Sequence, residues 1–244
     1  MDPIKKAAEI LRNARHTIAL TGAGISLESG IPDFRSPGGL WDRFDPAIYA
    51  HISSFHDMPT KVWEMIFEMI KIAGNAQPNP AHTALAELEK EKFLTAIITQ
   101  NIDNLHQEAG SQEVIEYHGN MKKLECLSCG KVYPLEKYDL TKKEAPLCEC
   151  GKILKPTVIF FGEQIPYDSM TYSQELAEST DAVIVAGTSA LVYPAAGIPL
   201  VAKRRGAKVI EMNLEETGLT NQVTDVFIKG SVGKTIPKLA AELV

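Results

Sequence analysis

The stretch His16-Thr-Ile-Ala-Leu-Thr-Gly-Ala-Gly24 decides the fold that this sequence predicts. Residues 16–20 are mostly apolar or β-branched, which is typical of a strand buried in a sheet that is covered on both faces. Gly22 and Gly24 follow directly, and a glycine turn after such a strand lets a pyrophosphate approach the backbone without interference from a Cβ atom. A tight turn without a ligand is the alternative, because Gly-x-Gly alone is a weak pattern.

The same kind of strand recurs along the chain. Apolar, β-branched runs bounded by turn residues are predicted as strands at 93–99, 181–186, 207–212 and 225–228. Helices are predicted at 3–14, 81–90 and 195–205, from proline and Asx starts, apolar faces and terminal glycines. Strands that alternate with helices predict an α/β fold, a Rossmann-like doubly wound parallel sheet.

Two segments interrupt this alternation. Residues 36–78 contain loops and one Met-rich amphipathic helix at 62–72, and residues 121–156 contain all four cysteines. We therefore expect a Rossmann-like domain from residues 1–35, 79–120 and 157–244. The smaller lobe then consists of a cofactor loop with a helical insertion at 36–78 and a zinc-binding module at 121–156.

Composition excludes some classes of partner. The formal charge is −6 and the longest basic run is Lys203-Arg204-Arg205, so we expect no direct contact with nucleic acid. The chain has no apolar run of about 18 residues and no signal-peptide pattern at its start, so we expect no membrane contact and a cytoplasmic location.

The residues after the glycine turn do not fit a dehydrogenase. A dinucleotide dehydrogenase has a third glycine where Leu27 stands, and an acidic residue at the end of a second strand about 20 residues on, whereas Asp42 has no strand around it. Instead, Pro32-Asp33-Phe34-Arg35 supplies an aromatic ring and a guanidinium at the far end of the turn.

Several such blocks, in order, resemble the sirtuin family of NAD-dependent protein deacylases. The blocks are Gly22-Ala-Gly-Ile-Ser26, Gly30-Ile-Pro-Asp-Phe-Arg35, Asn79-Pro-Ala-His82, Thr99-Gln-Asn-Ile-Asp-Asn-Leu-His106, Tyr117-His-Gly119, Val158-Ile-Phe-Phe-Gly-Glu163, Gly187-Thr-Ser189 and Val192-Tyr-Pro-Ala-Ala196. The resemblance covers nearly the whole chain. It implies an NAD-dependent protein-lysine deacetylase, with NAD as co-substrate, acetylated-lysine proteins or peptides as partners, and one structural Zn²⁺.

The resemblance also implies which residues bind NAD. Asn101 and Asp103 contact the nicotinamide carboxamide, Ile102 lines its pocket and Gln100 faces the ribose. A helix-capping role is the alternative for Asn101. The remaining NAD-binding residues are expected to be Gly22, Ala23, Gly24, Ser26, Asp33, Phe34, Arg35, Gly187, Thr188, Ser189, Asn213 and Val232.

One histidine stands out by its position. A lone histidine is more often structural, but His118 ends a strand-like run from Val114, and Gly119 lets the chain turn behind it. The resemblance implies that His118 is the general base. The catalytic residues implied by the resemblance are His118, Asn101 and Asp103. In the family, the acyl-lysine oxygen attacks the nicotinamide ribose. A ribose hydroxyl then attacks the imidate that forms. This step needs a base with a pKa near neutrality to take the hydroxyl proton, and imidazole fits.

The four cysteines form two close pairs, Cys126-x₂-Cys129 and Cys148-x-Cys150. In a reducing compartment such pairs indicate tetrahedral zinc, although the second pair is one residue shorter than the usual pattern and a non-metal role is the alternative. Four sulfur ligands leave no position for a reactive water, so the metal is expected to be structural.

The resemblance also places the peptide groove. Val158, Ile159, Phe160, Phe161, Gly162 and Glu163, with Val192 and Tyr193, are expected to pair with the substrate as added strands, and an ordinary buried strand is the alternative for 158–163. Desuccinylating members carry Tyr and Arg three residues apart on the helix after the cofactor loop. In this chain Trp63 and Ile66 stand at the matching spacing. Two apolar residues there indicate an apolar acyl pocket, which favours removal of acetyl groups, and core packing is the alternative role for both.

Other activities stay open at this point. A sirtuin-like mono-ADP-ribosyltransferase, a deacylase that prefers longer acyl groups and a non-catalytic NAD-sensing or zinc module are the alternatives. A pure binder has no need of a base, so the presence of His118, Asn101 and Asp103 disfavours the last of these.

Overall fold

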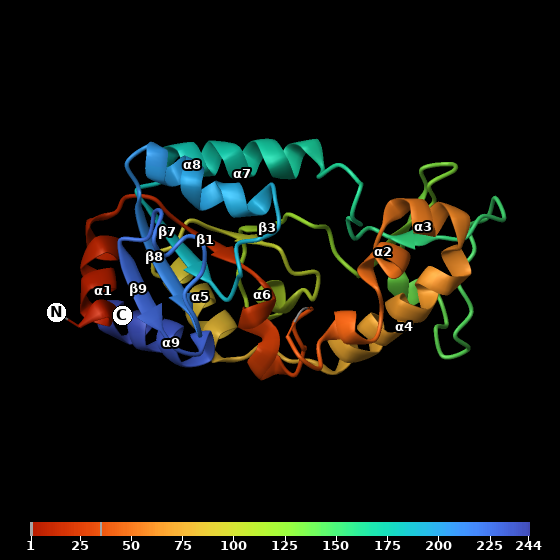
Figure 1. Cartoon of the computed structure of the whole chain (residues 1–244), viewed down its shortest axis with the longest axis horizontal. Coiled ribbons are helices and arrows are strands. Elements are labelled where there is room, and N and C mark those ends of the chain that lie inside the picture. The colour runs from red at the N-terminus through yellow and green to blue at the C-terminus, as the bar shows by residue number, and fades with distance from the viewer. Residues whose placement is uncertain (1, 35) are drawn as a thin grey trace.

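The computed structural model describes residues 2–34 and 36–244, and it confirms the predicted doubly wound α/β fold (Figure 1). The main sheet has six strands in the order β3-β2-β1-β7-β8-β9, and each neighbouring pair is parallel. Its strands are β1 (Thr17–Thr21), β2 (Ala96–Thr99), β3 (Val114–Glu116), β7 (Ala182–Ala186), β8 (Lys208–Asn213) and β9 (Val226–Lys229).

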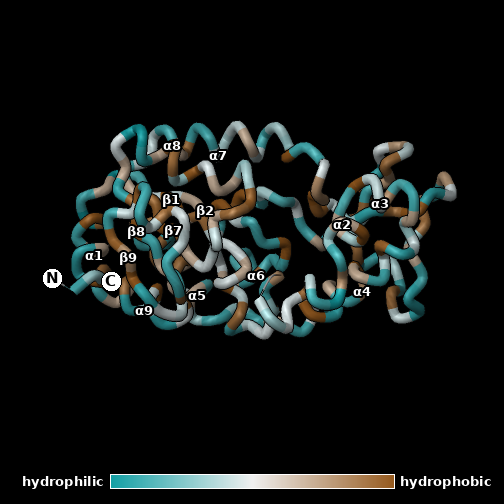
Figure 2. The backbone as a smooth tube through the Cα atoms, in the orientation of Figure 1, coloured by the Kyte–Doolittle hydropathy of each residue, from teal (hydrophilic) through white to brown (hydrophobic). Residues whose placement is uncertain are grey.

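Helices cover both faces of the main sheet. In Figure 1, α7 (Tyr167–Ser179) and α8 (Ile198–Arg204) lie on one face, and α1 (Pro3–Asn13), α5 (Pro80–Lys90) and α9 (Val232–Leu243) lie on the other. Alternate residues of β7 serve the two layers, because Ile184 packs in the cluster with Leu11 whereas Val183 packs in the cluster with Ile198. The brown segments of Figure 2 gather in these strands, between the helix layers.

The sequence did not predict helices α7 and α9 of the main domain, nor the two short helices at Pro46–Tyr49 and Ile52–Asp57, and the first two have a local reason. Helix α7 buries only Ser173 and Ala177 fully, so its sequence has little apolar periodicity. Helix α9 contains Pro237, a residue that normally disfavours a helix interior. The predicted helix 195–205 begins as the short 3₁₀ turn η4 (Ala195–Gly197) before α8. In the part of the chain that is described, no helix has the length and hydropathy needed to cross a membrane.

The smaller lobe combines helices with a second sheet. Helices α2 (Pro46–Tyr49), α3 (Ile52–Asp57) and α4 (Pro59–Asn75) pack with an antiparallel sheet of order β5-β4-β6. The strands are β4 (Lys123–Glu125), β5 (Val132–Pro134) and β6 (Lys155–Pro156). Trp63, Leu124 and Leu154 are wholly buried in the core between them. The domain boundaries given above stay predictions.

The connections of the main sheet create one natural binding crevice. From the central strand β1 the chain continues to β2 and β3 on one side, and β7, β8 and β9 lie on the other side. Ligands of open α/β sheets bind at the carboxyl ends of the strands where the strand order reverses, which here is the gap between β1 and β7.

Candidate active site

A cleft of about 960 Å³ opens at this edge of the main sheet. It is bordered by turns that follow β1, β2, β7, β8 and β9, and by residues of the smaller lobe such as Ala50 and Met65. The predicted NAD-binding residues that line it are Gly22, Ala23, Gly24, Asp33, Phe34, Gln100, Asn101, Ile102, Gly187, Thr188, Ser189, Asn213 and Val232. Arg35 lies outside the described residues.

The two glycines after β1 serve close packing. The Gly24 N–H donates to the Gly187 carbonyl at 2.8 Å, and a Cβ atom on Gly24 would lie 2.7 Å from the same oxygen. The Gly22 N–H donates to the Ala186 carbonyl at 3.2 Å. Both amides are thus bonded to backbone carbonyls, and the approach of a pyrophosphate to this turn stays a prediction. The glycines let the turn after β1 sit against the turn after β7.

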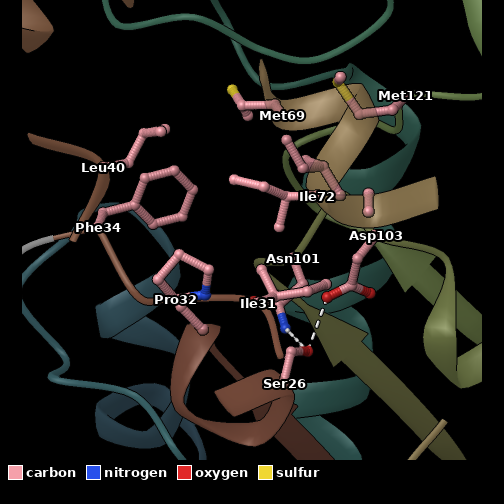
Figure 3. A pocket seen from close by; sticks show the side chains of 13 residues that line it. Ser26, Ile31, Pro32, Phe34, Leu40, Met69, Ile72, Asn101, Asp103 and Met121 are labelled. Carbon is pink, nitrogen blue, oxygen red and sulfur yellow. Dashed lines mark hydrogen bonds between the residues drawn. The ribbon is translucent and has the colours of Figure 1, made fainter. Parts of the chain in front are cut away.

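Beside the large cleft lies a smaller pocket of about 50 Å³ with one polar corner (Figure 3). The Ser26 hydroxyl, on the 3₁₀ helix η1 (Ala23–Ser29), donates to Asp103 Oδ2 at 2.7 Å, and the Asn101 amide donates to Ser26 Oγ at 3.1 Å. The rest of the lining is mainly apolar and comes from Ala23, Ile31, Pro32, Phe34, Leu40, Met69, Ile72, Ala73, Ile102 and Met121. The pocket thus offers amide and carboxylate groups at one end and an apolar wall opposite them.

Asn101 does not cap a helix. Its side chain is turned toward Ser26, and its backbone N–H donates to Thr99 Oγ1 at 3.1 Å. The N-cap residue of α6 (Leu105–Glu108) is Asn104, and Asp103 Oδ1 accepts from the first helical N–H, that of Leu105, at 3.0 Å. The capping alternative for Asn101 is therefore wrong, and its amide is held in the pocket by a hydroxyl.

The Gln100 side chain links the turn after β2 to the turn after β7. Its side-chain amide donates to Thr188 Oγ1 at 3.0 Å, and the Thr188 carbonyl accepts from the Asn213 amide at 2.9 Å. The turns after β2, β7 and β8 are thus tied together directly under the cleft.

The loop after η1 folds back over the cleft. The Asp33 carboxylate accepts from the N–H and the hydroxyl of Ser36 at 2.7 and 2.6 Å. The ring of Phe34 lies 5.1 Å from the ring of Trp41, and the Trp41 N–H donates to the Phe34 carbonyl at 2.9 Å. Phe34 lines both the large cleft and the small pocket, so it stands at their boundary.

His118 enters the large cleft with a fixed ring orientation. Its Nδ1 lies 3.1 Å from the Gln100 carbonyl oxygen, which can only accept, so Nδ1 carries the proton and Nε2 has the lone pair in the neutral ring. Gly119 has φ +70°, and a Cβ there would lie 2.0 Å from the Thr157 carbonyl, so only glycine allows this turn. Burial lowers the pKa of His118, against a raising effect of the bond to Gln100, so the ring is a neutral base at pH 7.

The predicted peptide segment borders the same cleft but forms no regular strand. Its lining residues are Ile159, Phe160, Phe161, Gly162, Glu163, Val192 and Tyr193. Val158 is buried and does not line the cleft. Residues 158–163 make only one isolated bridge, between His51 and Phe161, so the buried-strand alternative is wrong. The side chains of Phe161 and Tyr193 are 45% and 67% exposed, which leaves them accessible to a peptide.

Trp63 and Ile66 do not line the cleft. Both are wholly buried in the core of the smaller lobe, and Trp63 Nε1 donates to the Leu154 carbonyl at 2.8 Å. The core alternative is therefore correct for both residues. Met65 lines the large cleft and Met69 lines the small pocket. Both are apolar, so this face of α4 carries no Tyr and Arg pair.

The four cysteines converge. Their Sγ atoms all lie within 4.8 Å of one another, with 3.5 Å between Cys126 and Cys150 and 3.6 Å between Cys129 and Cys148. These separations are too long for disulfides and agree with four thiolates at about 2.3 Å from one tetrahedral zinc ion. Both pairs turn at a glycine of positive φ, Gly130 and Gly151, so a tight turn accommodates the shorter second pair.

Some cleft residues were missed by sequence reasoning. Residues 214–218, which follow β8, and Glu28, in η1, line the end of the cleft near Asn213. The rule that ligands meet the turns after parallel strands was sufficient to find 214–218. Glu28 had no such signal, because its contact with the Ser231 hydroxyl joins distant parts of the chain.

Comparisons with known proteins identify the family. The model of the Sir2 family matches residues 22–194. An NAD-dependent protein deacylase 2 of Archaeoglobus fulgidus is 47% identical over 246 residues, which cover 99% of this chain and 96% of the relative. A Sir2 homolog solved as an NAD complex is 41% identical with a TM-score of 0.91, and covers 98% of this chain and 93% of its own. Sir2Af2, solved with a myristoylated histone peptide, is 41% identical with a TM-score of 0.84, and covers 99% and 96%. The chain therefore belongs to the Sir2 family.

Proposed function

We propose that this protein is an NAD-dependent protein-lysine deacetylase. The observation that supports this most is the convergence of His118, the Ser26–Asn101–Asp103 corner and the peptide-bordering segment on one cleft. Similarity to a relative named as a deacylase and to Sir2 structures with NAD and with an acylated peptide supports it further. The products are nicotinamide, the free lysine and O-acetyl-ADP-ribose.

Each group in the cleft has a proposed role. Asn101 and Asp103 bind the nicotinamide carboxamide, since an amide and a carboxylate can pair with its two polar groups. Phe34 shields the reacting sugar from water. His118 accepts a proton from a ribose hydroxyl through Nε2, while the Gln100 carbonyl fixes the ring. The turns at Gly187–Ser189, Asn213 and Val232 hold the ribose, phosphate and adenine end.

The acyl-lysine peptide is proposed to pair with residues 159–163 and 192–193. An irregular segment at the cleft edge, outside the regular sheets, can accept an added strand, and main-chain pairing tolerates many sequences. The four cysteines would hold one structural Zn²⁺, which supplies folding energy to the smaller lobe. Clustered cysteine ligands are typical of a reducing compartment, which supports the proposed cytoplasmic location.

Removal of longer acyl groups is a second candidate activity. The apolar Met65 and Met69 on the cleft side of α4 favour a hydrocarbon chain over an acidic acyl group. Peptides that carry acetyl, myristoyl and succinyl lysine should separate these cases, with the succinyl peptide the poorest substrate.

The decisive experiment mixes the protein, NAD and an acetyl-lysine peptide. We expect steady-state nicotinamide release that depends on the peptide and is lost in His118→Ala, because without the base the imidate cannot be resolved for a second turnover. Release no greater than that of His118→Ala would contradict the proposal. Radiolabel transferred from NAD to protein, with acetyl-lysine untouched, would indicate a mono-ADP-ribosyltransferase instead.

A further inference from the structure

A wholly buried lysine lies behind the segment that borders the cleft. Lys155, in β6, has no exposed surface. Its ammonium donates to Glu125 Oε1 at 3.0 Å, to the Pro156 carbonyl at 3.0 Å and to the Val158 carbonyl at 2.8 Å. Lysine is almost never buried completely unless it is paired, because removing the charge from water is costly.

The same ammonium also contacts the far end of that segment. Lys155 Nζ lies 3.2 Å from Glu163 Oε2 and 5.0 Å from the centre of the Phe160 ring. Glu163 Oε2 in turn accepts from the Phe160 N–H at 2.6 Å. One charge therefore fixes both Val158 and Glu163, the two ends of the segment.

The segment is not part of a regular sheet, and its other hydrogen bonds lie in its middle or within the segment itself. Phe161 exchanges backbone hydrogen bonds with Ala50 and Ile52, and the Ile159 N–H donates to the His118 carbonyl at 2.9 Å. The Glu163 N–H donates to the Phe160 carbonyl at 3.0 Å, which closes a turn at the end of the segment. The Ile159 bond ties the segment to His118, and Lys155 adds the side-chain contacts that hold its two ends, at Val158 and Glu163.

Lys155 also connects this edge to the cysteine site. Its partner Glu125 belongs to β4 and directly precedes Cys126, and Lys155 lies opposite Glu125 in the register of β4 and β6. The ammonium thus joins the strand that leads into the metal site to the segment that borders the cleft.

We propose that Lys155 is a positioning residue for the acyl-lysine peptide, holding residues 158–163 in the shape that pairs with substrate through its contacts with Glu163, Glu125 and the Val158 carbonyl. This inference rests on the proposed function. NAD meets other parts of the cleft, so loss of the ammonium should weaken peptide binding without weakening NAD binding.

The test compares Lys155→Met and Glu163→Gln with the unchanged protein. Lys131→Met is the matched control, because Lys131 makes an ion pair with Glu149 in the same lobe and both side chains are more than half exposed. We expect Lys155→Met to raise the KM for an acetyl-lysine peptide about tenfold, the change expected for one lost charge-assisted contact, with the KM for NAD nearly constant. Glu163→Gln should shift the peptide KM in the same direction, and Lys131→Met should shift neither KM.

Amide hydrogen exchange supplies a readout that needs no catalysis. In Lys155→Met and Glu163→Gln the amide of Phe160 should exchange faster, while amides of β7 and β8 keep their protection. Three results, in whichever of these two variants folds, would overturn the inference. They are an unchanged KM for the peptide, an equal rise in the KM values for peptide and NAD, and unchanged exchange at the Phe160 amide. Absence of nicotinamide release by the unchanged protein would instead contradict the proposed function, and the exchange result would still decide whether Lys155 holds the segment.

Discussion

Acidification should destabilise this fold through His82 and His106. The two imidazoles pack with ring centroids 4.9 Å apart, and no more than 1% of the surface of either residue is exposed. His82 accepts from the Asn79 N–H at the start of α5, and His106 Nε2 lies 2.9 Å from the Thr21 hydroxyl. Burial penalises the charged form and lowers the pKa of His82 from 6.5 to about 4 and that of His106 to about 3.

The sign and size of the effect follow from proton linkage. Below pH 6.5 the unfolded chain binds protons at both histidines, whereas the folded chain binds them only near pH 4 and pH 3. The free energy of unfolding is therefore highest above pH 6.5 and falls as the pH drops toward 4. Each histidine contributes about 1.4 kcal/mol per pH unit in this window, so about 2 kcal/mol is lost at pH 5 for each residue, and about 4 kcal/mol for both.

Urea unfolding followed by tryptophan fluorescence at pH 7 and pH 5 measures this loss. His82→Gln removes one titrating group and keeps a side chain that can complete the capping box with Asn79. We expect the variant to lose about 2 kcal/mol less than the parent between the two pH values. Zinc release on acidification would affect both proteins alike, so the difference isolates His82. An equal loss in parent and variant would refute the reasoning.

Three further predictions concern the cleft and the metal site. The acid limb of kcat/KM should have its midpoint below pH 6.5, because burial lowers the pKa of His118 and the base must be neutral; a midpoint at or above 6.5 would contradict this. The buried carboxylate of Glu211 accepts from the hydroxyls of Thr217, Thr220 and Thr224 and so holds the cleft-lining residues 214–218. Glu211→Gln should therefore raise the KM for NAD about tenfold with little change in the peptide KM. An unchanged KM for NAD in this variant would contradict the prediction. Metal analysis should find one zinc ion per chain, and Cys148→Ser should lower both zinc content and Tm; a metal-free protein of unchanged Tm would exclude the structural zinc.

Features encoded locally were predictable from the sequence. The buried strands, the glycine turn and the paired cysteines are each specified by a few adjacent residues, and the structure contains all of them. The convergence of Gly22, Gln100, Gly187 and Asn213 followed from strand order, because parallel strands bring their carboxyl ends to one edge.

Features set by distant contacts were not predictable. The rotation of α4 is fixed by packing of Trp63 against Leu124 and Leu154, so Met65 lines the cleft where spacing alone had favoured Trp63 and Ile66. Residues 158–163 are apolar enough for a strand, but they are held in an irregular shape by Lys155. The amides of Gly22 and Gly24 are bonded to β7 and the turn that follows it, a partner that the turn sequence does not reveal.

The central claim is that the acyl group leaves lysine only as NAD is cleaved in the same cleft. The most direct test is a mass balance by mass spectrometry after reaction of the protein with NAD and an acetyl-lysine peptide. We predict equal amounts of nicotinamide and deacetylated peptide, with the acetyl group recovered on ADP-ribose. Deacetylated peptide accompanied by free acetate and intact NAD would contradict the claim.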